Sequence, residues 1–165
     1  MKPALLVIDV QKGCFQGQQD TVPPLKEACK NINLVIDLFR KKGMPVVCIR
    51  HMDEKYGMKP GEKAFETVDL LDILPEDIHV TKTYGNAFNK TELAEKLIGM
   101  GVDTVMPAGY CAEQCVLATC VGARDNDFMP VIIRGTLISH SLEQIRFVED
   151  GNDVMTIGAF WKAVD

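Results

Sequence analysis

Three of the six cysteines of this 165-residue chain fall close together, in the stretch AGYCAEQCVLATC at 108–120. These are Cys111, Cys115 and Cys120, and each is a candidate disulfide partner, metal ligand, core residue or nucleophile. Their spacing matches no common zinc pattern. The apolar stretch at the amino terminus is too short for an export signal, and disulfides are rare in the reducing cytosol. We therefore expect a cytoplasmic protein in which these cysteines are buried or reactive rather than crosslinked.

Cys115 has two charged residues as candidate partners elsewhere in the chain. Asp9 directly follows an apolar run at 4–8, Lys82 directly follows a run at 77–81, and Cys115 lies just after a run at 103–108. Ligands of open α/β sheets bind beyond the carboxyl ends of the strands, so all three residues are expected at one edge. Each also has a plain alternative: Asp9 as a turn cap, Lys82 as a solvated lysine, and Cys115 as a small buried side chain.

Together these three residue types predict nucleophilic chemistry. A cysteine near a helix amino terminus and a lysine has its pKa lowered from about 8.5 to between about 3.5 and 7.5. A carboxylate such as Asp9 can accept the thiol proton and later pass it to a leaving group. We therefore predict that Cys115 is a usable nucleophile at neutral pH.

Positioning these residues requires an alternation of strands and helices. Continuous apolar runs of this kind are typical of strands covered on both faces, as in a parallel sheet. The runs lie at 4–8, 45–49, 77–81, 103–108, 130–134 and 153–157, and helical spacing appears at 24–42, 91–99 and 112–124. The pattern predicts an α/β fold, a three-layer α/β/α sandwich with a six-stranded, mainly parallel Rossmann-like sheet. We expect one domain over residues 1–165.

One segment interrupts the alternation. Residues 51–76 contain Gly57, Pro60, Gly61 and mixed charges, and they predict a long surface excursion with at most one short helix. Long loops of this kind often border a functional site.

Composition excludes several classes of function. The formal net charge is -5 and the basic residues are scattered, which gives no footprint for nucleic acid or an anionic membrane. No run approaches the ~18 apolar residues that a membrane span needs. The first run is followed by DVQKGCFQG rather than a G-x-G-x-x-G turn, which argues against a dinucleotide site.

Three stretches, in order, resemble the isochorismatase-like cysteine hydrolases, a family that includes nicotinamidases and N-carbamoylsarcosine amidase. ALLVIDVQKGCF at 4–15 resembles the family's strand ending in Asp-x-Gln, here Asp9 and Gln11. VTKTYGNAFNKTEL at 80–93 resembles its Lys-x-x-x-Ser-Ala-Phe-x-x-Thr-x-Leu stretch, beginning at Lys82. AGYCAEQCVLATCVGARD at 108–125 resembles its Gly-x-x-Thr-x-x-Cys-Val segment, from Gly109 to Cys115 and beyond.

The resemblance implies a hydrolase that cleaves a small amide or carbamoyl C–N bond through a covalent Cys115 thioester. It implies a triad of Asp9 as general base and acid, Lys82 as electrostatic partner and Cys115 as nucleophile. It also implies a cis peptide between Tyr110 and Cys111, which would aim the amides of Cys111 and Cys115 at one point as an oxyanion hole.

The departures from the family pattern concern the metal and the pocket. Ile49 stands two residues before His51, where nicotinamidases carry the Asp of a metal-binding Asp-x-His, so we expect no metal and no other cofactor. Asn86 and Ala112 replace the usual Ser and Thr, which leaves the pocket open to question. Isochorismatases proper lack the nucleophilic cysteine, so Cys115 argues against vinyl-ether hydrolysis.

Five residues are candidates for contact with a small-molecule substrate, and every aromatic among them suits the core equally well. They are Phe15, His51, Tyr84, Phe88 and Tyr110. His51 is equally consistent with a satisfied loop histidine.

The assembly state and an alternative function can also be stated as expectations. Family members assemble into oligomers, so we expect a homodimer or homotetramer, with Trp161 and its apolar neighbours forming an interface or covering the last strand. The alternative function is a non-catalytic or redox-sensing domain in which Cys111 or Cys14 resolves an oxidised Cys115.

Overall fold

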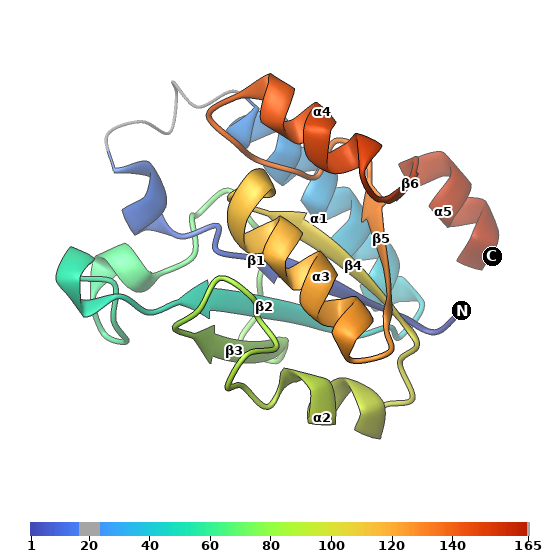
Figure 1. Cartoon of the computed structure of the whole chain (residues 1–165), viewed down its shortest axis with the longest axis horizontal. Coiled ribbons are helices and arrows are strands. Elements are labelled where there is room, and N and C mark those ends of the chain that lie inside the picture. Colours follow the sequence, from blue (N-terminus) through green and yellow to red (C-terminus); the bar gives the residue numbers. More distant parts are fainter. Residues whose placement is uncertain (17–23, 165) are drawn as a thin grey trace.

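The structure, a computed structural model, describes residues 1–16 and 24–164 and contains one six-stranded sheet (Figure 1). Its strands are β1 (Pro3–Ile8), β2 (Val46–His51), β3 (Ile78–Lys82), β4 (Thr104–Gly109), β5 (Met129–Ile133) and β6 (Asp153–Met155). Their order is β3-β2-β1-β4-β5-β6 and every neighbouring pair is parallel. All six predicted strands are confirmed, although β6 is shorter than expected because the chain turns into a helix at Ile157.

Helices cover both faces of the sheet, which confirms the predicted three-layer sandwich. They are α1 (Leu25–Lys41), α2 (Leu93–Gly99), α3 (Leu117–Asp125), α4 (Leu142–Asp150) and α5 (Ile157–Val164). Side chains of α1 and α5 share one apolar cluster, in which Phe39 stacks on Phe160 at a ring-centroid distance of 5.3 Å. Side chains of α2, α3 and α4 belong to a second cluster, and Figure 1 shows α1 and α3 on opposite sides of the sheet.

Strand β1 lies at the point where the chain changes direction across the sheet. From β1 the chain adds β2 and then β3 on one side, and it returns to place β4 on the other. In open α/β sheets the loops on either side of such a switch point diverge, and ligands bind between them, beyond the carboxyl ends of the strands. The corresponding loops here are those that leave β1 and β4.

The backbones of β1 and β4 approach each other closely at the point where these two loops begin. Gly109 ends β4 with a φ of 109°, and a Cβ there would meet the carbonyl oxygen of Ile8 and lie 2.9 Å from Cγ2 of Val10. The next amide, that of Tyr110, donates to the same Ile8 carbonyl at 2.9 Å. Only glycine permits both this conformation and this contact.

The prediction for residues 51–76 is wrong in three respects. His51 belongs to β2, and the segment forms two short 3-10 helices, Glu54–Tyr56 and Lys63–Phe65, rather than at most one. It is also less of a surface excursion than expected, since Phe65 and Val68 are only 4% and 1% exposed. The side chains of Val68 and Leu71 belong to the apolar cluster of α1, which anchors the end of the segment on that side of the sheet.

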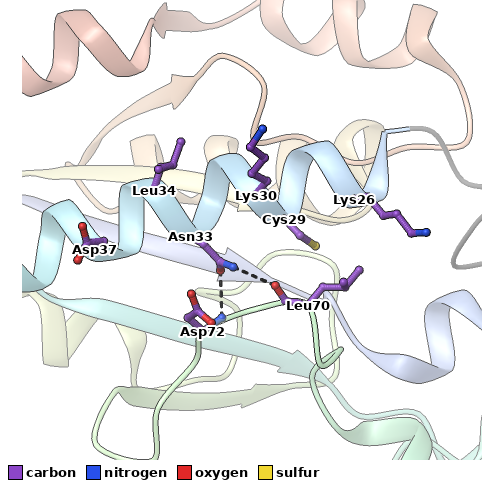
Figure 2. A pocket seen from close by; sticks show the side chains of 8 residues that line it. All are labelled: Lys26, Cys29, Lys30, Asn33, Leu34, Asp37, Leu70 and Asp72. Atoms are coloured by element: carbon purple, nitrogen blue, oxygen red, sulfur yellow. Dashed lines mark hydrogen bonds between the residues drawn. The ribbon is translucent and has the colours of Figure 1, made fainter.

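The end of this segment is fastened directly to α1. Asn33 donates from its amide to the carbonyl of Leu70 at 2.9 Å and accepts from the amide of Asp72 at 3.0 Å, as Figure 2 shows. A surface groove of about 430 Å³ runs beside these bonds, lined by α1 and residues 70 and 72. None of the predicted site residues lines this groove.

We predict that Gly109→Ala lowers the free energy of unfolding by about 3 kcal/mol, because it adds strain at positive φ to an overpacked contact. Urea denaturation measures the loss. The control is Gly99→Ala, since Gly99 lies in α2 with no neighbouring atom within 4 Å of the added Cβ. That variant should be unchanged or slightly more stable. Equal stability of the two variants would contradict the prediction.

Candidate active site

The three predicted reactive residues meet at the carboxyl edge of the sheet. Asp9 follows β1 with a left-handed φ of 51°, a conformation that Asp tolerates better than most residues. Lys82 is the last residue of β3 rather than the residue after it. Cys115 lies in a π-helical turn, Ala112–Val116, between β4 and α3. The helix predicted at 112–124 thus begins with a widened turn of a kind frequent at functional sites.

A buried ion pair lies at the centre of this group. Nζ of Lys82 lies 2.7 Å from Oδ2 of Asp9, and the two side chains are 0% and 4% exposed. Burial raises the pKa of Asp9, and the opposing pull of the Lys82 ammonium offsets this only in part. The other oxygen, Oδ1, is buried without a well-aligned hydrogen-bond partner among the described residues.

Lys82 has an acceptor for each of its three N–H groups. Besides Asp9, its Nζ donates to the carbonyl of Tyr84 at 3.0 Å and to Nδ1 of His51 at 3.3 Å. A buried ammonium is tolerated when its charge is paired and its donors are satisfied. Lys82 is therefore a fixed positive charge in the site.

The environment of Cys115 corrects the prediction of a lowered thiol pKa. Burial, followed by the charge of Asp9, raises the pKa of Cys115 to about 11. Lys82 acts in the opposite direction but does not prevail. The helix end and the lysine alone predict a lowered pKa of the thiol, but desolvation is the largest influence and acts in the opposite direction.

Cys115 and Asp9 consequently behave as a coupled pair. The thiol lies close enough to the carboxylate to lower its pKa as a weak hydrogen-bond donor, while the carboxylate charge opposes ionisation of the thiol. If the proton moves from sulfur to Asp9, that repulsion disappears and the Lys82 charge faces a thiolate. The arrangement can therefore generate a nucleophile by proton transfer within the site.

The turn before Cys115 has the geometry that the resemblance implied. The Tyr110–Cys111 peptide is cis. The turn is fastened to the loop after β5, because the amide of Ala112 donates to the carbonyl of Ile138 and the amide of Ile138 donates to the carbonyl of Gly109, at 2.9 and 2.8 Å. These bonds hold the segment from β4 to Cys115 in place.

Three of the predicted substrate residues lie around the reactive group. His51 touches Lys82 through its imidazole, and Tyr84 supplies a carbonyl to Lys82 while its ring is 42% exposed. Tyr110 is half-buried, and its hydroxyl lies 3.1 Å from Nε2 of His140. All three keep some side-chain surface available to a ligand, since His51 and Tyr110 are both half-buried.

The other two predicted substrate residues are core residues. Phe15 is 0% exposed and packs edge-on against Tyr110 at 4.9 Å between ring centroids. Phe88 is 8% exposed and stacks on Phe128 at 5.6 Å, within the cluster beneath α2 and α3. Phe15 packs against the ring of Tyr110, whereas the contacts of Phe88 lie within the apolar core.

Gln11 is a residue to which the sequence analysis gave no role. Its side chain is buried, accepts from the amide of His51 at 2.7 Å, and donates to the carbonyls of His51 and Phe65 at 3.0 and 3.1 Å. The signal was present in the Asp-x-Gln pattern. A lone glutamine has no reactivity of its own, so residue chemistry did not single it out.

The substitution of Asn for the family's Ser at position 86 has a local explanation. Oδ1 of Asn86 accepts from the amide of Phe88 at 2.9 Å, and the side chain lies directly over Gly122 of α3. A Cβ at position 122 would collide with it. The glycine thus makes room for the larger Asn side chain.

The remaining cysteines are free thiols with different surroundings. Cys29, Cys48 and Cys120 are buried. Cys111 is buried and directly precedes the π-helical turn that contains Cys115. Cys14 is partly exposed, and burial together with the Asp9 charge raises its pKa to about 12.

The residues near His51 do not fit a resident metal ion. Ile49, at the position of the missing carboxylate, is apolar and 1% exposed, and Nδ1 of His51 is occupied by Lys82. Within residues 1–16 and 24–164, no group of three or more His, Cys, Asp or Glu side chains could hold a metal. No metal-dependent step is therefore derived for this site.

Comparison with known proteins identifies the family and agrees with the fold. The family model described as "Isochorismatase domain" matches residues 3–148, and the chain therefore belongs to the isochorismatase family of hydrolases. It is 30% identical over 123 residues to the uncharacterized isochorismatase family protein YrdC of Bacillus subtilis, spanning 72% of this chain and 64% of that protein. It is 29% identical over 150 residues to maleamate amidohydrolase of Pseudomonas putida, spanning 81% and 70%.

Among solved structures, the chain is similar to an isochorismatase-like hydrolase from Alkaliphilus metalliredigens. The TM-score is 0.89, with 22% identity and 100% coverage of both chains, which supports the fold. None of the helices in the described part of the chain has the length and apolar character to cross a bilayer.

We predict that Lys82→Met lowers the free energy of unfolding at pH 8 by about 3–5 kcal/mol, because it leaves the Asp9 carboxylate buried without a counter-charge. The pKa of Asp9 is already raised, and it rises further in this variant. The penalty is therefore largest above that pKa and shrinks as the pH falls and Asp9 takes up a proton. Urea denaturation at pH 8 and pH 5 tests this sign.

The matched control for the ion pair is the double variant Asp9→Asn/Lys82→Met. Removal of both charges should restore most of the stability lost in Lys82→Met at pH 8. Additive losses in the double variant would show that the two charges do not interact as the 2.7 Å contact indicates.

We also predict that Asp9→Asn increases the rate at which iodoacetamide alkylates Cys115 at pH 8. Removal of the carboxylate charge lowers the pKa of the thiol, and Lys82 still favours the thiolate. Site-resolved mass spectrometry measures the rate at Cys115 separately from the other thiols. Slower alkylation would mean that Asp9 already acts as a base toward the thiol in the resting protein.

Proposed function

We propose that this chain is a cysteine amidohydrolase that cleaves a small amide or carbamoyl C–N bond through a covalent intermediate on Cys115. The observation that carries the proposal is the buried Asp9–Lys82 ion pair with the Cys115 thiol beside it, at the carboxyl edge of the sheet. Membership of a hydrolase family and similarity to a maleamate amidohydrolase support the same reaction class.

In the first half-reaction the thiol attacks the substrate carbonyl. As the S–C bond forms, the proton of Cys115 passes to Asp9, and the carbonyl oxygen becomes an oxyanion. Asp9 then gives that proton to the departing nitrogen as the C–N bond breaks. Ammonia or an amine leaves, and a thioester, or a thiocarbamate from a carbamoyl substrate, stays on the sulfur.

In the second half-reaction water replaces the amine. Asp9, ionised again, accepts a proton from the attacking water, and the oxygen bonds to the acyl carbon. The C–S bond then breaks, the acid is released, and the proton on Asp9 returns to sulfur. The carboxylate thus moves one proton in each direction while Lys82 keeps its charge throughout.

The oxyanion is assigned to the backbone amides of Cys111 and Cys115. This assignment is supported by the neighbouring amides, which already have backbone acceptors. The amide of Ala112 donates to the carbonyl of Ile138, and the amides of Gln114 and Val116 both donate to the carbonyl of Cys111. The cis peptide before Cys111 changes the direction of its amide relative to a regular turn. Fixed donors aimed at a developing charge contribute several kcal/mol to such reactions.

The redox-sensing alternative is less well supported. Sensor cysteines are typically exposed thiols of low pKa, whereas burial and Asp9 raise the pKa of Cys115 to about 11. A thiol that ionises only by transfer to a neighbouring base is better suited to attack a bound substrate. The hydrolase is therefore preferred.

We further infer that residues 1–165 act as one domain and that the protein is a cytoplasmic homo-oligomer, a dimer or a tetramer. The apolar tail is helix α5, in which Phe160 is buried against Phe39 and covers the sheet. Trp161 is 45% exposed and remains available for an interface. Sedimentation analysis of wild type and Trp161→Ala tests whether Trp161 contributes to an interface between subunits.

The test of the proposed function is a screen for ammonia release from small amides, dicarboxylic acid monoamides, carbamoyl compounds and nicotinamide. Cys115→Ala and Asp9→Asn should each lower turnover by roughly 10³-fold or more, because each removes a group that the chemistry requires. Mass spectrometry of Asp9→Asn with substrate should show whether an acyl adduct accumulates on Cys115. Turnover that survives in Cys115→Ala would refute the mechanism.

A further inference from the structure

His51 is the one imidazole in contact with the buried ion pair among the described residues. Its Nδ1 lies 3.3 Å from Nζ of Lys82, and burial together with the Lys82 charge lowers the pKa of His51. The ring is therefore neutral at neutral pH. Because Lys82 can only donate, Nδ1 must carry the lone pair, and the ring proton sits on Nε2.

The backbone of His51 is held from both sides. On one side, His51 pairs with Lys82 in the β2–β3 ladder. On the other, the Gln11 amide accepts from its N–H at 2.7 Å and donates to its carbonyl at 3.0 Å, much as a neighbouring strand would. The second proton of the Gln11 amide goes to the carbonyl of Phe65 at 3.1 Å, so all the donors of Gln11 are satisfied.

We propose that His51 and Gln11 are positioning residues that hold the Lys82 ammonium against Asp9 and Cys115, and that His51 is not a substrate contact. Nδ1 of His51 completes the set of three acceptors around Nζ, with Asp9 and the carbonyl of Tyr84. Gln11 fixes the backbone from which that imidazole extends. The inference rests on the proposed function only in giving Lys82 its role beside Cys115.

Loss of the Nδ1 acceptor has a defined consequence for the thiol. Nζ of Lys82 would keep one buried N–H without a partner, and the ammonium would rotate or shift toward another acceptor. Lys82 is the charge that favours ionisation of Cys115, so its displacement leaves the thiol harder to ionise. The reactivity of Cys115 thus reports the position of Lys82 without any substrate.

Two substitutions of His51 separate the atoms of the imidazole. The side-chain oxygen of Asn lies close to the position of Nδ1, whereas that of Gln lies close to Nε2. His51→Asn therefore keeps an acceptor for Lys82, and His51→Gln moves it away. The two variants are otherwise similar in polarity, which makes each the control for the other.

The experiment measures the pH dependence of Cys115 alkylation by iodoacetamide, resolved by mass spectrometry. At pH 8, His51→Gln should react about tenfold more slowly than wild type, as one unit of pKa change requires, while His51→Asn stays within about twofold. Gln11→Glu should resemble His51→Gln, because its carboxylate faces the carbonyls of His51 and Phe65. Urea denaturation confirms that each variant is folded.

Steady-state kinetics on a substrate from the ammonia screen distinguish positioning from binding. Positioning predicts a lower kcat with KM nearly unchanged in His51→Gln, and rescue in His51→Asn. Unchanged alkylation together with a raised KM in both variants would overturn the proposal and return His51 to the substrate. If the screen yields no substrate, the proposed function fails, but the alkylation profiles still decide the role of His51.

Discussion

The buried ion pair between Asp9 and Lys82 is the interaction on which the rest of the site depends. Two charges with almost no solvent contact are stable only when held close together, here at 2.7 Å, and the remaining donors of Lys82 are satisfied by His51 and Tyr84. That distance requires the ends of β1 and β3 to be level, although β2 lies between them. The all-parallel register of these three strands provides this alignment, so the arrangement of the sheet also sets the geometry of the ion pair.

The ion pair also determines when the thiol becomes reactive. With Asp9 ionised, burial and repulsion keep the proton on Cys115, and the resting protein presents a neutral thiol. In the proposed mechanism that proton leaves as sulfur attacks, and the Lys82 charge then stabilises whichever of the two partners is negative. A nucleophile made in this way is available to a bound carbonyl and poorly available to oxidants or metals in solution.

Much of the fold, but less of the site, was predictable from sequence. Fully buried parallel strands produce continuous apolar runs, and residues that follow them must share an edge, so Asp9, Lys82 and Cys115 could be placed together. The buried side chains of residues 51–76, such as Phe65 and Val68, follow no period, so their anchoring was not visible. The pKa of Cys115 depends on desolvation by distant parts of the chain, and the role of Gln11 consists of bonds to a backbone 40 residues away.

The position of His51 shows how one residue type changes its role with its neighbours. In the nicotinamidases that this chain resembles, a carboxylate two residues before the corresponding histidine forms a metal site with it. Here that position is Ile49, whose side chain belongs to the apolar core and offers no ligand atom. Nδ1 then faces the Lys82 ammonium, which lowers the pKa of the ring and keeps it an acceptor. With Ile49 in β2 instead of a carboxylate, the imidazole of His51 orients the Lys82 ammonium rather than binding a metal cation.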